Sequence, residues 1–195
     1  MSRGARITRT TGETHVELSL ELEGSGEGVR STGVGFFDHM LDAVARHGGL
    51  DLEVNAEGDH QTGAHHTVED TGIVLGRALD EALGDRAGIR RYGSAVVPMD
   101  EARAMCALDV SGRAFVAFDG DLPAEAVAGF DSDLLEEFLR AVANSAKLTV
   151  HVTIERGTNT HHMVEAAFKA FARALRDAVS IDPGESGVPS TKGLL

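Results

Sequence analysis

The stretch His65-His66-Thr67-Val68-Glu69 recurs 96 residues later as His161-His162-Met163-Val164-Glu165 in this chain of 195 residues. Apolar residues follow both copies at matching positions, so that Leu75 corresponds to Phe171. Two amphipathic helices can share apolar positions by chance. A shared core of two histidines, a valine and a glutamate argues instead for duplication of one structural unit.

The similarity continues upstream of both histidine pairs. Ala43-Val44-Ala45 matches Ala141-Val142-Ala143 at an offset of 98 residues, and Leu20–Gly24 resembles Leu108–Gly112 at an offset of 88. The change from 98 to 96 means that the second copy lacks two residues in the loop before its histidine pair. Each unit therefore occupies about half of the chain.

We place the first unit at residues 1–86 and the second at residues 87–195, which includes a C-terminal tail. The two units together form one compact protein. The offset of 88 also pairs Glu13 with Glu101 near the start of each unit.

Hydrophobic periodicity predicts the secondary structure of each unit. Residues 15–22 alternate between apolar and polar, which is typical of a half-buried strand. Similar patterns predict strands over residues 50–56, 105–110, 114–118 and 148–154, and helices over residues 36–46, 68–83, 134–143 and 164–179. Ser111-Gly112 is expected to form a hairpin-like connection. Strands mixed with helices indicate an α+β fold, with sheets covered by helices on one face.

The composition excludes several classes of protein. The net charge of −13 argues against general affinity for nucleic acid, although a few basic side chains can still hold a small anionic substrate. The single cysteine cannot form an internal disulfide, which favours a reducing compartment. The N-terminus lacks the apolar core of a signal peptide, and no stretch approaches the ~18 apolar residues of a membrane span. The prediction is a cytoplasmic protein without a membrane partner.

The repeated stretch carries residues that bind metal ions. Residues three or four apart on a helix are neighbours, so Glu69 lies within reach of both His65 and His66. Adjacent histidines point in different directions, and one unit can therefore offer ligands to two ions. Imidazole nitrogen combined with carboxylate oxygen suits a borderline divalent metal such as manganese, iron, cobalt or zinc.

The repeat extends this candidate metal site to both units. His39 lies in a helical stretch of the first unit, and the offset of 98 places Glu137 at the equivalent position. The predicted ligands are His39, His65, His66, Glu69, Glu137, His161, His162 and Glu165. His151 is a weaker candidate. The alternative is that these histidines cap helices or form hydrogen bonds in the core.

Several motifs carry a resemblance to a known family. They are FFDHML at residues 36–41, HHTVEDTGIVLG at 65–76, SGR at 111–113, HHMVEAAFKAFARAL at 161–175, and the closing Pro189-Ser190-Thr191-Lys192-Gly193. In this order they resemble the imidazoleglycerol-phosphate dehydratases of histidine biosynthesis, over nearly the whole chain.

The resemblance implies a reaction and an assembly. The reaction is dehydration of imidazole glycerol phosphate, a small phosphorylated imidazole, to imidazole acetol phosphate. The resemblance also implies two Mn²⁺ ions per site and a homo-oligomer of 24 subunits with active sites between subunits. The implied fold is a duplicated β-α unit, in which mainly antiparallel four-stranded sheets pack on helices.

The resemblance also implies roles for individual residues. It supports the metal ligands named above, except that many members have a histidine where this chain has Glu137. A carboxylate can still bind manganese, so Glu137 stays among the predicted ligands. Glu13 matches the candidate acid–base residue, and Glu69 and Glu165 are further catalytic carboxylates. The residues that match the phosphate site are Arg91, Arg113, Lys169, Ser190 and Lys192. The tail at residues 182–193 would close over the substrate, where composition alone suggests a disordered end.

Two other functions remain open from the sequence. The first is a non-catalytic protein of the same fold that binds metal for assembly. The second is a metallohydrolase. It is the weaker alternative, because the chain lacks the His-Glu-x-x-His arrangement that places a base beside the metal.

Overall fold

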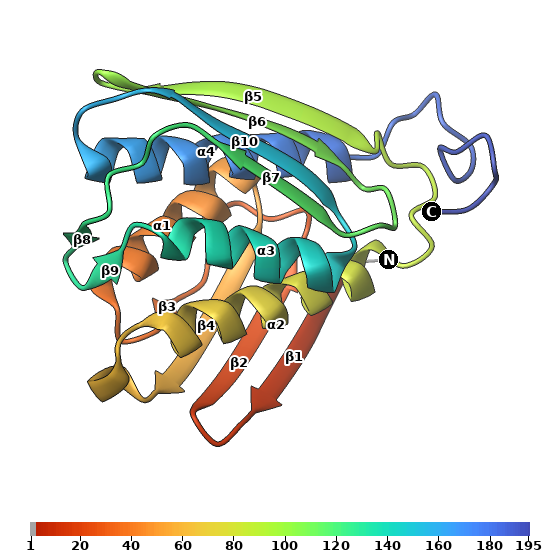
Figure 1. Cartoon of the computed structure of the whole chain (residues 1–195). Coiled ribbons are helices and arrows are strands. Elements are labelled where there is room, and N and C mark those ends of the chain that lie inside the picture. Colours follow the sequence, from red (N-terminus) through yellow and green to blue (C-terminus); the bar gives the residue numbers. More distant parts are fainter. Residues whose placement is uncertain (1–2) are drawn as a thin grey trace.

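The computed structural model describes residues 3–195 and contains two four-stranded sheets with helices between them (Figure 1). The first sheet has the order β1-β2-β4-β3. Its strands are β1 (Gly4–Thr10), β2 (Thr14–Glu21), β3 (Arg30–Ser31) and β4 (Asp51–Gly58). Only the β3–β4 pairing is parallel, so the sheet is mainly antiparallel, as expected.

The second sheet repeats this topology with the order β5-β6-β10-β7. Its strands are β5 (Tyr92–Met99), β6 (Ala102–Asp109), β7 (Phe115–Asp119) and β10 (Thr149–Arg156). Strand β6 lies 88 residues after β2, and β10 lies 98 residues after β4, the same offsets that relate the sequence copies. The predicted α+β fold with an internal duplication is therefore confirmed. A small hairpin of β8 (Ala126–Val127) and β9 (Phe130–Asp131) is added to the second half.

Four helices fill the space between the sheets: α1 (Gly35–Gly48), α2 (His65–Leu83), α3 (Leu134–Ala146) and α4 (Thr160–Val179). Helix α2 covers β1 and β2, and α4 covers β5 and β6. The helices also pack across the duplication, α2 against α3 and α1 against α4. A short 3₁₀ helix, η1 (His60–Thr62), precedes α2.

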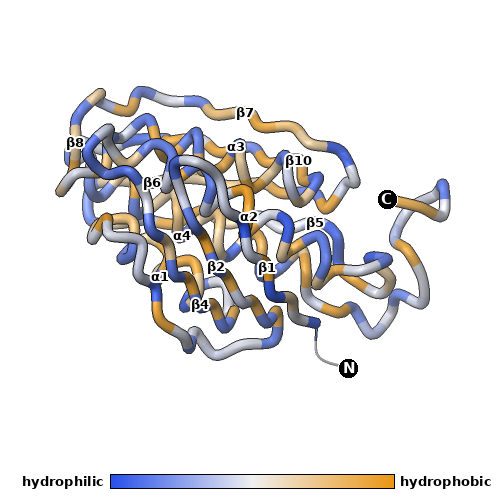
Figure 2. The backbone as a smooth tube through the Cα atoms, turned by 90° about the horizontal axis from the view of Figure 1, so that it is seen from below, coloured by the Kyte–Doolittle hydropathy of each residue, from blue (hydrophilic) through white to orange (hydrophobic). Residues whose placement is uncertain are grey.

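One hydrophobic core joins both halves, because each four-stranded sheet and each of the helices α1 to α4 turns an apolar face inward. Along β2 the buried Val16, Leu18 and Leu20 alternate with polar residues, and Figure 2 shows this alternation along the strands. The ring of Phe37 on α1 lies 5.9 Å from that of Phe130 and 5.5 Å from that of Phe138 on α3. The core therefore holds the helices of one half against those of the other.

Two details differ from the sequence analysis. Helix α2 begins at His65 rather than at residue 68, so the whole histidine pair belongs to the helix. Ser111-Gly112 is not a hairpin turn, because β10 lies between β6 and β7, antiparallel to the first and parallel to the second. Five strands were not predicted from the sequence: β1, β5 and the two-residue strands β3, β8 and β9. Strand β5 is an edge strand that contains Pro98, which a central strand would not tolerate.

Among residues 3–195, no helix is both long enough and apolar enough to cross a membrane. The single cysteine, Cys106, is buried in β6, and burial raises the pKa of its thiol to about 12. The cytoplasmic location and the boundary between residues 86 and 87 stay predictions.

The contact between α2 and α3 depends on glycine. A Cβ added at Gly76 would lie 2.6 Å from the carbonyl oxygen of Val142. We expect Gly76→Ala to lower the melting temperature. Replacing glycine by alanine stabilises an isolated helix by about 1 kcal/mol. Here the added methyl group would overpack the contact, which costs about 1–3 kcal/mol, because the backbone oxygen of Val142 cannot rotate aside. The control is Gly35→Ala at the start of α1, where an added Cβ has no neighbour within 4 Å. A melting temperature that rises for Gly76→Ala would show that the helices are not in this close contact.

Candidate functional site

The repeated His-His-x-x-x-Glu pattern places both histidine pairs at one end of the molecule (Figure 1). Helices α2, α3 and α4 all begin at the end opposite to the two chain termini (Figure 1). His65 and His66 lie in the first turn of α2, and His161 and His162 in the first turn of α4. We call this the histidine end, and we call the opposite end, where the C-terminal segment lies, the tail end.

A three-residue cluster at the histidine end is suited to a metal ion. One donor atom from each of His39, His161 and Glu165 lies within 4.8 Å of the other two. A carboxylate oxygen of Glu165 lies 3.1 Å from His161 Nε2 and 3.6 Å from His39 Nε2. Two imidazole nitrogens and one carboxylate oxygen form a donor set that fits a borderline divalent cation.

Lys169 keeps the carboxylate of this cluster ionised. Its Nζ lies 2.6 Å from the second oxygen of Glu165, whose side chain is only 6% exposed. Burial acts to raise the pKa of Glu165, but the hydrogen bond and charge of Lys169, together with His39 and His161, outweigh it and lower the pKa. The anion that a metal would need is therefore present in the folded protein.

The repeat produces a second, looser cluster. His65 Nε2 lies 3.9 Å from a carboxylate oxygen of Glu69, and His65 shares with Glu137 a cavity of about 260 Å³. By the repeat, Glu137, His65 and Glu69 correspond to His39, His161 and Glu165. Each cluster combines the two units, because one uses α1 with α4 and the other uses α3 with α2.

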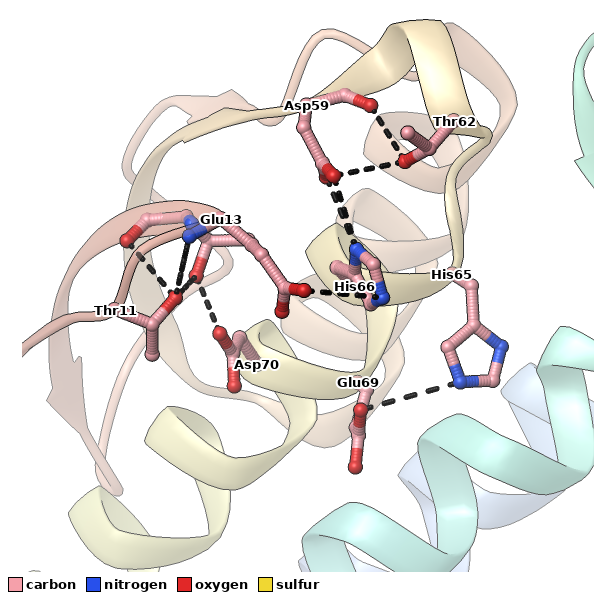
Figure 3. Close-up of polar contacts among 9 residues, drawn as sticks. Thr11, Glu13, Asp59, Thr62, His65, His66, Glu69 and Asp70 are labelled. Carbon is pink, nitrogen blue, oxygen red and sulfur yellow. Dashed lines mark hydrogen bonds and ion pairs between the residues drawn. The ribbon is translucent and has the colours of Figure 1, made fainter.

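The second histidine of the first pair has its own partners (Figure 3). His66 Nδ1 lies 3.1 Å from both carboxylate oxygens of Asp59, and His66 Nε2 lies 3.8 Å from Glu13. The hydrogen bond with Asp59 raises the pKa of His66. Thr14 donates a hydrogen bond to the buried Asp70 of α2, which ties the β1–β2 turn carrying Glu13 to the helix carrying His66.

The second histidine of the other pair is held in a similar way by Glu101. Its Oε2 lies 2.8 Å from His162 Nδ1, while Oε1 accepts hydrogen bonds from the backbone N–H groups of Thr158 and Asn159. The hydrogen bond with His162, followed by these backbone groups, lowers the pKa of Glu101 to about 2. His162 Nε2 lies 3.7 Å from Asp100.

Most of the residues matched to the phosphate site lie together at the tail end. Arg91, Arg113, Ser190 and Lys192 line one cavity of about 1010 Å³ beside the C-terminal segment. Arg91 forms an ion pair with Asp109 at 2.7 Å and donates a hydrogen bond to the carbonyl oxygen of Pro189 at 2.8 Å. This contact fixes the C-terminal segment against the second sheet.

Lys169 does not belong to that cavity. It lies beside Met99, where β5 ends, whereas Arg91 directly precedes the start of β5. Eight residues of strand at about 3.3 Å each separate them by about 25 Å. In one chain, the basic residues that were matched to a single phosphate site are therefore divided between the two ends of the molecule.

Two carboxylates of the site escaped the sequence analysis. Asp59 had no signal of its own, because it lies in the loop between β4 and η1. Glu101 was paired with Glu13 by the repeat but received no role. The alternative to metal binding was that the histidines form structural hydrogen bonds, and His66 and His162 do form such bonds, with Asp59 and Glu101. His151 lies on the exposed side of β10 near Phe115, outside these clusters.

Comparison with known proteins gives one consistent family. A profile of imidazoleglycerol-phosphate dehydratase matches residues 32–175. The chain is 54% identical to that enzyme of Acetivibrio thermocellus over 195 residues, covering all of both chains. It is 56% identical to that of Symbiobacterium thermophilum over 99% of this chain and 93% of the relative.

Solved structures agree with this result. The crystal structure of imidazoleglycerol-phosphate dehydratase from Staphylococcus aureus superposes with a TM-score of 0.83 at 41% identity, over 92% of this chain and 99% of the other. The structure from Pyrococcus furiosus, in complex with (S)-C348, superposes with a TM-score of 0.84 at 37% identity, over 97% of this chain and all of the other.

The lowered pKa of Glu101 predicts a dependence of stability on pH. A carboxyl group whose pKa is depressed by folding stabilises the folded state above its unfolded pKa of about 4.3, and this contribution is lost as the pH falls toward 2. In metal-free protein, the stability advantage of the wild type over Glu101→Gln should therefore shrink between pH 5 and pH 2. Chemical denaturation at several pH values measures this advantage, and a constant difference would contradict the prediction.

Proposed function

Since this chain belongs to the imidazoleglycerol-phosphate dehydratase family, we propose that it converts imidazole glycerol phosphate to imidazole acetol phosphate and water, using two Mn²⁺ ions per active site. Membership of the family makes the chain a dehydratase, a hydro-lyase of histidine biosynthesis. The proposal concerns the metal, the substrate contacts and the residues that move protons.

The cluster of His39, His161 and Glu165 is the observation that carries the proposal. We assign these residues, together with His162 and the first-unit counterparts His65, His66, Glu69 and Glu137, as metal ligands. A divalent cation bound there would stabilise the imidazolate form of the substrate ring, from which loss of the hydroxyl group is easier.

The carboxylates differ in whether they suit metal binding or proton transfer. Glu165 is held by Lys169 and buried, which suits a fixed ligand better than a group that exchanges protons. Glu13 is more than half exposed and stands beside His66, where a substrate can reach it. We therefore propose Glu13 as the residue that moves protons, a role that contributes ~10²–10⁴-fold to the rate of such reactions, and we keep Glu69 and Glu165 as secondary candidates.

The phosphate of the substrate needs cations, and the tail-end cavity contains them. Arg91 and Arg113 suit bidentate contacts with phosphate, and Lys192 adds a point charge. This cavity lies about 25 Å from Lys169 along β5. A complete site therefore requires the tail end of one subunit beside the histidine end of another. This arrangement supports a homo-oligomer, for which the family resemblance suggests 24 subunits with the C-terminal tail closing over the substrate.

A non-catalytic metal-binding protein is the alternative. Such a protein would need the histidine end, but it would have no use for a separate cavity with Arg91, Arg113, Ser190 and Lys192. The presence of both ends in one chain favours the enzyme.

Two substitutions separate metal binding from proton transfer. We expect His161→Ala to lose both bound Mn²⁺ and turnover, because it removes a donor from the cluster. We expect Glu13→Gln to keep its Mn²⁺ and to lose ~10²–10⁴-fold in kcat. Metal content by elemental analysis and formation of imidazole acetol phosphate from the purified substrate measure the two properties.

The control is His15→Ala on β2, where the ring bonds Thr10 on the open side of the first sheet. This variant should match the wild type in both assays. Full activity of a metal-free His161→Ala protein would exclude the proposed metal chemistry. An unchanged kcat for Glu13→Gln would exclude Glu13 as the residue that moves protons.

Removal of metal should also change the assembly. If ions at the histidine end contact a neighbouring subunit, a chelator will convert the particle into smaller oligomers, and added Mn²⁺ will restore it. Gel filtration coupled to light scattering measures the mass in each state. An unchanged mass after verified metal removal would show that metal ions do not hold the subunits together.

A further inference from the structure

We propose that Glu101 and Asp59 are positioning residues, whose carboxylates accept the Nδ1–H of His162 and His66 and thereby present the Nε2 lone pair of each ring to a divalent metal ion. The inference rests on the proposed function, because it assumes that these two rings bind metal. It assigns a task to two carboxylates that are not themselves expected to be ligands.

The contacts of Glu101 show how it would do this. An ionised carboxylate can only accept hydrogen bonds. Because its Oε2 lies 2.8 Å from His162 Nδ1, the single proton of a neutral ring must sit on Nδ1. The lone pair of the ring is then on Nε2, which lies 3.7 Å from Asp100 Oδ2, beyond hydrogen-bond distance. Carboxylates that orient metal-binding histidines in this way typically change metal affinity 10–100-fold.

Asp59 holds the other ring from an equivalent direction. Both of its oxygens lie 3.1 Å from His66 Nδ1, and Thr62 Oγ1 donates a hydrogen bond to one of them at 2.8 Å. Figure 3 shows Asp59 on one side of the His66 ring and Glu13 on the other. His66 therefore also presents Nε2 toward the group that we propose to act on the substrate.

The two carboxylates do not correspond in the repeat. The counterpart of Glu101 is Glu13, which faces Nε2 of His66 rather than Nδ1. The offsets of 96 and 98 place Glu155 and Gly157 opposite Asp59, and Glu155 pairs with Arg103 instead. The two halves therefore hold the same ring nitrogen with carboxylates from different loops. The two contacts therefore were not inherited from one contact in the ancestral unit. A need for a hydrogen-bond acceptor at Nδ1 in both halves explains why each half has one.

A purely structural role for Glu101 is the competing explanation, since it also binds the backbone at the start of α4. That role uses only Oε1, which accepts from the N–H groups of Thr158 and Asn159. The contact with His162 uses Oε2. The two roles can therefore be separated by a substitution that alters one oxygen and keeps the other.

Glu101→Gln makes this separation. The amide oxygen can keep both backbone contacts, while the amide nitrogen faces Nδ1 and can only donate, which forces the ring proton onto Nε2. Titration of the metal-free full-length protein with Mn²⁺ in a calorimeter should show 10–100-fold weaker binding at the affected site. Glu155→Gln is the matched control, because the same change is made on a carboxylate that pairs with Arg103. It should bind Mn²⁺ as the wild type does.

A second measurement reads the position of the ring protons directly, and its wild-type arm does not depend on the folding of any variant. Solid-state ¹⁵N spectra of metal-free wild type with labelled histidine rings, at a pH where the rings are neutral, should show His162 and His66 with the proton on Nδ1. Glu101→Gln should move the proton of His162 to Nε2 and leave His66 unchanged.

Three outcomes bear on the proposals. Wild-type Mn²⁺ affinity in a folded Glu101→Gln protein would overturn the positioning role while leaving the proposed function intact. A wild-type His162 ring protonated on Nε2 would overturn it as well. Failure of the wild type itself to bind Mn²⁺ would overturn the metal-dependent function, and the positioning role with it.

Discussion

The packing of helices across the duplication is the contact on which the rest of this molecule depends. Helix α2 lies against α3 through Gly72 and Gly76, and α1 lies against α4 around the shared phenylalanine core. Each contact brings side chains of one half of the chain beside the histidine and glutamate of the other half. Neither unit alone contains both parts of a cluster. The duplication therefore provides the residue types, and the helix packing brings them together.

The clusters also show how a buried charge is kept in the folded state. Glu165 is removed from water, which by itself favours the neutral acid, yet Lys169 lies four residues further along α4 and compensates for the lost hydration. Glu101 is not buried, since its side chain is 36% exposed, but hydrogen bonds from His162 and from backbone N–H groups lower its pKa in the same direction. In both cases the surrounding donors keep the carboxylate anionic without a bound ion. In the proposed metal site, the carboxylate of Glu165 and the ring that Glu101 holds would thus be largely ordered before an ion binds, which would reduce the cost of ordering them.

The separation of the two ends gives the fold its second constraint. Strand β5 has Lys169 beside its last residue and the basic cavity beside its first residue. A strand of eight residues is too long for one small substrate to contact both ends. In the proposed homo-oligomer, the tail end of one subunit would lie beside the histidine end of another and so complete the site. Three of the 18 lysines and arginines, Arg91, Arg113 and Lys192, line the tail-end cavity, so a few placed cations can attract an anion to a protein whose net charge is −13.

The sequence alone determined the duplication, the α+β class and the residue types of the candidate metal site, because local periodicity and spacing encode which residues share a helix face. For example, Glu165 follows His161 by four residues on one helix, and this spacing places the two side chains side by side. Only the tertiary structure decided that His39 joins that pair, that Asp59 and Glu101 hold the second histidines, and that Lys169 lies far from Arg91. These contacts join segments far apart in the chain. They depend on how whole faces of sheets and helices pack, and no local pattern specifies that packing.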